Sequence, residues 1–279
     1  MRSISKPDWN NRLLLRQIVE NDRLHAAAPI RLHHVYVLLR YRLYKRYQGN
    51  PWHVRVDNQF SPDKQHFENV YGRPPASLDP LIERLRQFHI TGACPMCGGS
   101  GTGTLDHYLP QAHFPEFSFF SLNLIPTCFK CNIKRKDAYI GDEQDKRPIH
   151  PYFDAAAANQ LIKIQMSGPF EAPSFSVVPI MIHAAHLADA LQWHIEHIIK
   201  PAGILGHCQQ RWSRLVEQPV LHLADIPDPN LVRNRLKDLA SMSAHIEESN
   251  NSWDSLFFDG VSDSNDAIDF LVEVIRTVI

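Results

Sequence analysis

Two CxxC pairs constrain the fold of this chain more than any other feature of its sequence. The first pair is Cys94 and Cys97, and the second is Cys128 and Cys131. A CxxC turn brings two sulfurs close enough to share one ion, and zinc prefers four such ligands in a tetrahedron with Zn–S distances of ~2.3 Å. The glycine-rich segment 98–103 supplies the positive φ angles that a tight turn needs. The sequence therefore predicts one structural zinc ion bound by all four thiolates.

Disulfide bonds and a redox CxxC are the alternatives to zinc. The chain opens on a largely polar segment, Met1 to Trp9, without an apolar signal sequence, which predicts a cytoplasmic protein. Structural disulfides are rare in that compartment, and a redox site would need only one CxxC. Zinc is therefore the preferred interpretation. Cys208 lies far from both pairs and is expected to be a small buried hydrophobic residue.

The segment between the two pairs carries polar residues on a predicted hairpin. Thr104–Leu109 alternates like a strand and contains Asp106 and His107, and Leu122–Thr127 is a second short apolar run. The residues after Cys131 predict a helix. Successive strand residues point to opposite faces, so the strand must end or bulge if Asp106 and His107 act at one site. The predicted order is strand, loop, strand, helix.

This block resembles the HNH endonuclease motif on a ββα-metal unit whose two ends are held by a four-cysteine zinc site. The match runs from Cys94 to Asp137: CxxC, then hydrophobic-Asp-His-hydrophobic-hydrophobic-Pro, then Asn-Leu-hydrophobic-Pro-x-Cys-x-x-Cys-Asn-x-x-x-Lys. The resemblance implies that His107 is the general base that deprotonates the attacking water, a role that suits imidazole. It also implies that Asp106 and Asn132 bind one catalytic Mg²⁺ or Mn²⁺. Asn123 would clamp the loop that carries His107.

Many HNH motifs end in a histidine where this chain has Asn132, so the chain is similar to the H-N-N variants. An amide oxygen favours Mg²⁺ or Mn²⁺ over metals that prefer imidazole. Bound there, the ion would stabilise charge on the scissile phosphate and on the departing 3′ oxygen. Asn132, Arg135 and Lys136 share one helix face by their spacing. Arg135, Lys136 and the neighbouring Lys134, which lies off that face, are the candidate nucleic-acid contacts.

Other histidines are weaker candidates. His113 lies beside an aromatic loop, residues 114–120, that is expected to pack over the small domain, and His150 is expected to support the fold rather than to catalyse. Four further histidines fall near one another on one predicted helix and suggest a second zinc site. No cysteine completes that set locally, so exposed or hydrogen-bonded side chains are preferred for His183, His186, His194 and His197.

Charge is distributed unevenly along the 279 residues. Residues 1–93 contain 15 Lys and Arg against 8 Asp and Glu, whereas residues 151–279 contain 8 against 16. A basic N-terminal third beside the motif suits a nucleic-acid backbone. The acidic C-terminal part is expected to face solvent or a protein partner. No run of 18 apolar residues exists, which predicts no membrane span.

The flanking regions are predicted to be mostly helical. A helix capped by Asp8 or Asn10 is expected to run to about Ala27, and a second from Arg31 to Tyr47 with Leu32, Val35, Leu39 and Leu43 on one stripe. Its basic residues and tyrosines favour a basic solvent face with a tyrosine seam, or else a nucleic-acid groove. Residues 50–75 are expected to be an irregular connector. Further elements are expected as a helix from Asp79 to Ile90, strands at 161–166 and 175–180, and helices at 183–199, 204–217, 229–248 and 264–278.

The sequence thus predicts an α+β fold: a mostly helical chain around a small zinc-bound, treble-clef-like ββα-metal unit. Three regions are expected, namely 1–92 (helical, basic), 93–150 (HNH nuclease) and 151–279 (mainly helical, acidic, with a possible hairpin). The predicted function is a metal-dependent endonuclease that hydrolyses DNA phosphodiesters, with RNA as an alternative substrate. A non-catalytic zinc-containing module that binds nucleic acid or protein is the alternative function.

The layout also loosely resembles HNH effector subunits of bacterial anti-phage systems, of Septu-type or retron-linked loci. That resemblance implies an ATPase or another defence-system subunit as a partner. An oligomer is possible, because one HNH site cuts one strand at a time.

Overall fold

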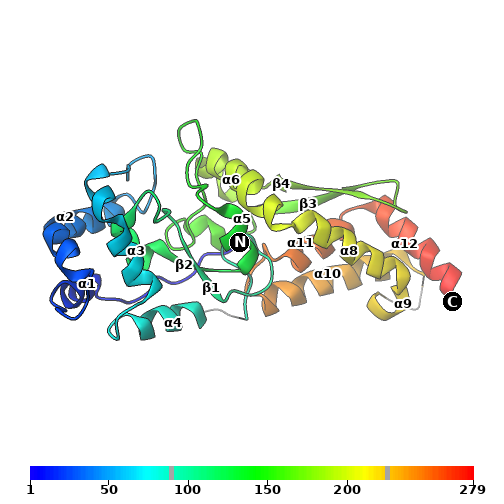
Figure 1. Cartoon of the computed structure of the whole chain (residues 1–279). Helices are drawn as coiled ribbons and strands as arrows, with labels where there is room; N and C mark the ends of the chain where they lie inside the picture. The colour runs from blue at the N-terminus through cyan, green and yellow to red at the C-terminus, as the bar shows by residue number, and fades with distance from the viewer. Residues whose placement is uncertain (88–90, 224–226) are drawn as a thin grey trace.

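The computed structural model describes residues 1–87, 91–223 and 227–279. The molecule is elongated, with helices α1 to α4 at one end and the C-terminal helices at the other (Figure 1). The described residues form many helices and two antiparallel two-stranded sheets, so the α+β class is confirmed. No helix in these residues is long and apolar enough to cross a membrane.

The N-terminal end contains more helix than the sequence predicted. Its helices are α1 (Asn11–Val19), α2 (Ala27–Arg46), α3 (Lys64–Gly72) and α4 (Asp79–Gln87), with a 3₁₀ helix at Asn58–Asp63. The Asn10 side chain accepts a bond from the Leu13 N–H and caps α1, as predicted. That helix ends at Val19 rather than near Ala27. The predicted end of α4 near Ile90 lies outside the described residues.

The expectation of an irregular connector over residues 50–75 is wrong, because α3 lies within it. Its four prolines stand at 51, 62, 74 and 75, so they border the helix instead of interrupting it. Phe67 and Val70, three residues apart on α3, are fully buried and anchor the helix to the core.

Helix α2 packs against the core through a different face from the leucine stripe that the sequence predicted. Its buried side includes Tyr41 and Tyr44, which confirms the tyrosine seam. Leu32, Val35 and Leu39 of the predicted stripe are instead exposed. Tyr41 stacks on Phe120 at 4.1 Å between ring centroids, so aromatic packing against the loop after β1 decides which face turns inward.

The central hairpin and helix occur in the predicted order. Strand β1 (Thr104–His107) pairs with β2 (Leu124–Thr127) in antiparallel register, and α5 (Phe129–Arg135) follows. The connection contains 3₁₀ turns at Pro115–Phe117 and Ser121–Asn123. Strand β1 runs to His107 and pairs regularly with β2 through both Asp106 and His107, so the strand has no bulge at these two residues.

The C-terminal end follows the sequence closely. Strands β3 (Ile162–Ser167) and β4 (Ser174–Pro179) form the expected hairpin. The side chains of Asp228 and Ser264 cap the helices that they precede. The helix expected at 183–199 starts later, because two 3₁₀ turns (Met181–His183 and Ala185–Leu187) precede α6. The elements after β4 are α6 (Ala188–His194), a π turn (Ile195–Ile199), α7 (Lys200–Ala202), α8 (Ile204–Glu217), α9 (Pro219–His222), α10 (Pro229–Ile246) and α12 (Asn265–Val278).

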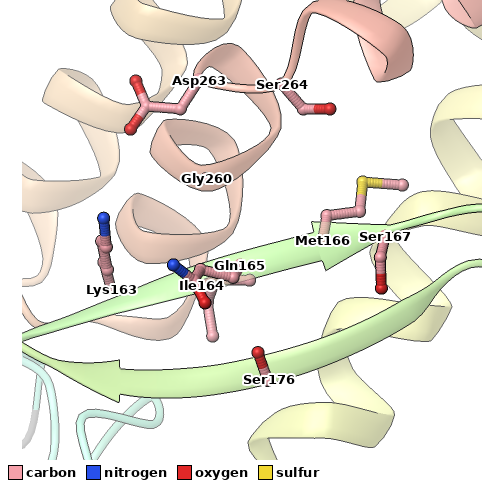
Figure 2. Close-up of a pocket in the computed structure, with 9 residues that line it drawn as sticks. All are labelled: Lys163, Ile164, Gln165, Met166, Ser167, Ser176, Gly260, Asp263 and Ser264. Carbon is pink, nitrogen blue, oxygen red and sulfur yellow. The ribbon is translucent and has the colours of Figure 1, made fainter.

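Helix α11 (Trp253–Ser262) was not predicted. Nearly all its residues are buried, so its sequence lacks the one-sided apolar pattern that reveals a surface helix. Gly260 lets it approach β3, since a Cβ there would meet the Ile164 carbonyl oxygen at 2.5 Å. Figure 2 shows Gly260 facing the strand that carries Ile164, beside a shallow polar groove that includes Lys163 and Asp263.

Candidate metal centre and adjoining polar site

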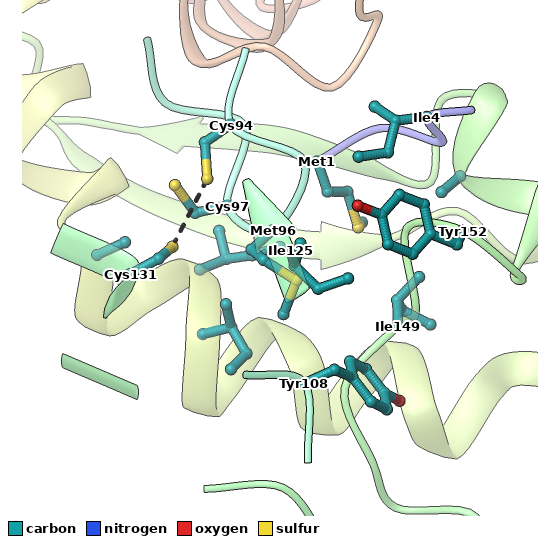
Figure 3. Packing of buried hydrophobic residues seen from close by; sticks show 14 of the residues in the cluster. Met1, Ile4, Cys94, Met96, Cys97, Tyr108, Ile125, Cys131, Ile149 and Tyr152 are labelled. Carbon is teal, nitrogen blue, oxygen red and sulfur yellow. Dashed lines mark hydrogen bonds between the residues drawn. The ribbon is translucent and has the colours of Figure 1, made fainter. Parts of the chain in front are cut away.

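The four cysteines of the CxxC pairs converge on one point. Their sulfur atoms all lie within 4.8 Å of one another, and no other group of three or more His, Cys, Asp or Glu in the described ranges is arranged to hold an ion. The sulfurs of Cys94 and Cys131 are 3.9 Å apart, and those of Cys97 and Cys128 are 3.7 Å apart. Zn–S bonds of ~2.3 Å in a tetrahedron require sulfur separations of ~3.8 Å. The cluster therefore has the size to hold zinc, as predicted, and Figure 3 shows three of its cysteines beside Met1 and Met96.

Backbone geometry fixes these sulfurs in place. The Gly99 N–H donates to the Cys97 sulfur at 3.3 Å, and the Cys128 N–H donates to the Cys94 sulfur at 3.3 Å. Gly98 has φ +82°, and a Cβ there would meet the Asn251 carbonyl oxygen at 2.1 Å. The turn therefore needs glycine, both for its conformation and for the close approach of the C-terminal region.

The C-terminal region supports the cluster from outside. The indole N–H of Trp253 donates to the Cys97 carbonyl at 2.7 Å, and Nε2 of His194 donates to the Met96 carbonyl at 2.7 Å. Nδ1 of His194 accepts from the Ile149 N–H, and burial lowers the pKa of His194 to about 4. His194 is thus a hydrogen-bonded core residue.

The other histidines of that predicted helix do not gather around a second metal. Nδ1 of His197 bonds the Trp193 carbonyl at 3.0 Å, and its ring stacks on the Trp193 indole. His186 is exposed, and the side chain of His183 lies outside the described part. The preference for exposed or hydrogen-bonded histidines is confirmed for the three that are described.

Asp106 is held by a buried arginine. The Nε of Arg135 donates to Oδ2 of Asp106 at 2.6 Å, and the other guanidinium nitrogens donate to the carbonyls of His107, Tyr108 and Ala138. Arg135 therefore lies on the side of α5 that faces β1, but it is buried and cannot be the nucleic-acid contact that was predicted. It is 3% exposed and ties the last turn of α5 to the end of β1.

The geometry around His107 defines its tautomer. Its Nε2 lies 2.8 Å from the Ser118 carbonyl oxygen, which can only accept, so Nε2 carries the proton and Nδ1 carries the lone pair. Burial lowers the pKa of His107, although the Ser118 carbonyl and the Asp106 carboxylate act in the opposite direction. A neutral imidazole with a lone pair on Nδ1 is the form that a general base needs.

Asn123 connects the two ends of the loop between β1 and β2. Its Oδ1 accepts from the Leu109 N–H at 2.8 Å, and its Nδ2 donates to the Leu109 carbonyl at 3.0 Å. The Tyr44 hydroxyl on α2 bonds Oδ1 of Asn123 and also Nε2 of His150, at 3.2 and 3.1 Å. These contacts suit a structural clamp, and they place His150 in a fully buried supporting position.

Asn132 lies one helical turn before Arg135 and also faces β1. Its Nδ2 donates to the Leu105 carbonyl at 3.4 Å, next to Asp106. This bond uses the amide nitrogen, so the amide oxygen is the atom left for a cation. Lys134 and Lys136 are exposed, but α5 ends at Arg135 and Lys136 has φ +48°, so the basic residues do not form one continuous helical face.

The N-terminal helices contribute two residues that the sequence did not reveal. The ring of Tyr71 on α3 packs edge-on against the His107 imidazole, with 4.5 Å between centroids. Burial raises the pKa of Tyr71, although the Arg86 guanidinium on α4 acts in the opposite direction. Neither residue belongs to a motif, and α3 was itself unexpected. The apolar pair Phe67 and Val70 was the sequence signal that could have revealed helix α3.

His113 stands apart from this site. It is exposed, and its ring contacts Tyr139 at 5.6 Å between centroids. The neighbouring aromatic loop is buried, as expected, through Phe114, Phe117, Phe119 and Phe120.

These observations define a protein with a four-cysteine cluster that could hold a metal ion and an adjoining buried polar site. In comparisons with known proteins, the chain is similar to Protein ea31 of Escherichia phage lambda, with 45% identity over 139 residues. The similar segment spans 50% of this chain and 40% of ea31. No protein-family model matches the chain. No solved structure matches it either.

Proposed function

We propose that this chain is a metal-dependent phosphodiesterase of the HNH endonuclease type. The observation that carries the proposal is the environment of His107. A backbone carbonyl binds its Nε2–H, its Nδ1 keeps the lone pair, and it stands at the end of a strand next to Asp106. An imidazole held in this way is suited to take a proton from water.

The donor atoms beside His107 suit a hard cation. Asp106 offers a carboxylate and Asn132 an amide oxygen, and both lie where β1 meets α5. Mg²⁺ accepts a small number of protein oxygens together with water and phosphate oxygens. When bound, it would supply charge stabilisation for the phosphate and the leaving oxygen. Asp106 and Asn132 would hold the ion, and His107 would accept the proton on Nδ1.

The four cysteines have a structural part in this proposal. Zinc bound to them would fix the start of α5 to the segment before β1, since each CxxC pair comes from one of these segments. That connection sets where Asn132 lies relative to Asp106. Zinc is the fitting ion because the site offers four thiolates and no open position for substrate.

One observation favours the alternative, a zinc-containing binding module without catalysis. Asp106 and His107 are each only 8% exposed, and the carboxylate of Asp106 is already paired with Arg135. A closed arrangement of this kind also occurs in purely structural networks. Catalysis would require substrate or metal to compete with Arg135 for Asp106.

Nicking of supercoiled plasmid separates the two functions. The wild-type chain is expected to nick DNA with Mg²⁺ or Mn²⁺, and His107→Ala is expected to lower the rate by at least about 100-fold. His113→Ala is the matched control, because it removes an exposed histidine from the adjoining loop. Zinc content and melting temperature must be equal in all three proteins. Unchanged nicking by His107→Ala, or none by the wild type, contradicts the proposal.

The substrate and the partner are further parts of the proposal. Labelled duplex DNA compared with single-stranded RNA would distinguish the two substrates. Lys134 and Lys136 are exposed and are the candidates for contact with a nucleic-acid backbone. Arg135 is buried and is no longer a candidate for that contact. The anti-phage role and its ATPase partner rest on the resemblance alone, and the similarity to a phage protein adds no support.

A further inference from the structure

Helix α2 carries a second apolar face that no other described element covers. Leu32 is 80% exposed, Val35 65%, Tyr36 52% and Leu39 50%. The spacing i, i+3, i+4 and i+7 places these four side chains on one stripe. Single exposed apolar residues are ordinary on a protein surface, but an aligned set of four large ones is typical of an interaction site. We call this set the α2 stripe.

The opposite side of α2 is firmly packed. Ile30, Val37, Tyr41 and Tyr44 are all buried, and they lie roughly half a turn around the helix from the α2 stripe at 3.6 residues per turn. The Tyr44 hydroxyl is further tied to Asn123 and His150. The α2 stripe therefore cannot turn inward without breaking the core, and it stays available on a rigid helix.

The charge around the stripe indicates what binds it. Arg42 and Arg46 are exposed and flank the stripe on one side by their helical spacing, whereas Arg31 on the same side is paired with Asp22. The sequence of α2 contains no acidic residue. The surface therefore combines a narrow apolar strip with a positive border, and the complementary shape is a helix with an apolar face and acidic residues beside it.

Two other occupants fit less well. A second copy of α2 packed antiparallel would offer Arg42 and Arg46 no carboxylate from α2 itself, and the nearby Asp22 is already paired with Arg31. A nucleic-acid backbone would use the arginines but would leave the leucines and the valine without apolar contact. The first alternative leaves the positive border without carboxylates, and the second leaves the apolar strip uncovered.

We propose that the α2 stripe is a docking site for an acidic amphipathic helix of a protein partner. Leu32, Val35, Tyr36 and Leu39 would receive the apolar face, and Arg42 and Arg46 would pair with its carboxylates. Helix α2 lies at one end of the molecule (Figure 1), and the stripe does not include residues of the polar site. The proposal therefore holds whether or not the chain is a nuclease.

The test uses the full chain and a fluorescent synthetic helix of about 20 residues, with leucines at i, i+3, i+4 and i+7 and glutamates at the remaining outer positions. Fluorescence anisotropy is expected to give a Kd in about the micromolar range. Val35→Glu/Leu39→Glu is expected to weaken binding at least about tenfold. Arg42→Glu should weaken it about threefold or more at low salt and less at high salt. The same peptide with lysines in place of glutamates should bind at least about tenfold more weakly.

The matched control is Met242→Glu/Ile246→Glu, a second exposed i, i+4 apolar pair on α10, which should leave binding unchanged. Melting temperatures equal to wild type show that the variants fold. Absence of binding, or binding unaffected by Val35→Glu/Leu39→Glu, overturns the proposal. So does a concentration-dependent dimer that this variant abolishes, because the occupant is then a second copy. Loss of duplex-DNA affinity in Val35→Glu/Leu39→Glu equal to that in Arg42→Glu would assign the surface to nucleic acid instead.

Discussion

The segment 94–154 and the C-terminal region 155–279 are built from different kinds of core. Among the described residues, both contain many fully buried side chains, but the first region also buries charged and titratable groups. In the second region, His194 is the one Asp, Glu, His, Lys or Arg that is buried within the described residues. The buried set in the first region is Asp106, His107, Glu116, Arg135, Arg147 and His150.

This difference shows which region contains buried charges that lower the stability of the fold. A buried charge is unfavourable unless it is paired and hydrogen-bonded. Arg135 meets that condition through Asp106 and three backbone carbonyls, and Arg147 through two bonds to Asp154 and one to the Pro148 carbonyl. The C-terminal region instead leaves its main ion pair, Arg211 with Asp254, partly exposed. A costly polar interior in one region beside an ordinary apolar one is typical of a functional site on a supporting scaffold.

Removal of zinc should have the largest effect on stability, and that effect should fall on segment 94–154. Cys131→Ala is expected to abolish stoichiometric zinc binding and to unfold segment 94–154, because structural zinc contributes on the order of 10 kcal/mol to small units. Zinc per chain and hydrogen exchange measure both effects. Cys208→Ala is the control, since Cys208 is buried on α8 and outside the cluster. Retention of one zinc per chain by Cys131→Ala would contradict the four-thiolate centre.

Breaking one ion pair in each region should sharpen the contrast. Arg135→Met leaves Asp106 and several carbonyls without a donor, and the expected loss is about 3–5 kcal/mol. Arg211→Met in the C-terminal region removes a partly exposed pair and should cost at most about 1 kcal/mol. Urea unfolding of both variants measures the two values. Equal losses would show that the polar interior has no special cost.

The cysteine centre and the order of the central elements could be predicted from sequence because both rest on local spacing. Two CxxC pairs define four ligands without any knowledge of the fold, and the residues between them alternate like strands. The same holds for the caps at Asp228 and Ser264, whose partners lie within three residues. The nuclease assignment has a weaker basis, since it comes from resemblance and stays a prediction.

Long-range packing was what the sequence did not reveal. The face of α2 that turns inward depends on rings from the loop 114–120, and those contacts join residues about 75 positions apart. The position of Arg135 depends on Asp106, 29 residues earlier. Helical spacing placed it on the face of Asn132 and made it a candidate nucleic-acid contact, because spacing cannot show which charged side chain finds a buried partner. Helix α11 was missed because it is surrounded by core on nearly every side.

The folding stability of the two regions should also change with pH in opposite directions. Burial raises the pKa of Glu116 to about 7 despite its bond to Arg40, whereas the pKa of Asp254 is lowered to about 2, because its bonds to His207 and Arg211 outweigh partial burial. A raised carboxyl pKa stabilises the fold at low pH, and this contribution is lost as pH rises from about 4.5 through 7. A lowered carboxyl pKa, as at Asp254, stabilises the fold above about pH 3.8, and this contribution is lost as the pH falls through about 2.

Two neutral variants separate these effects in thermal unfolding measured across pH. Glu116→Gln should flatten the decline in stability between pH 5 and 8, by on the order of 1–3 kcal/mol. Asp254→Asn should flatten the decline in acid by less than about 1 kcal/mol, since solvent screens this partly exposed group. A decline between pH 5 and 8 that persists in Glu116→Gln would assign it to another group.

The smallest effect is expected at the edge of the polar region, where the N-terminal helices meet it. Tyr71→Phe keeps the ring against His107 but removes the hydroxyl, whose pKa burial raises and the Arg86 guanidinium lowers. Because the ring contact is retained, stability should change by no more than about 1 kcal/mol. If His107 acts in catalysis, nicking should fall by less than about threefold, because the ring that packs against the imidazole is retained. Tyr36→Phe, an exposed tyrosine on α2, is the matched control. A larger fall in nicking at unchanged stability would contradict this expectation and would give the Tyr71 hydroxyl a part in the reaction.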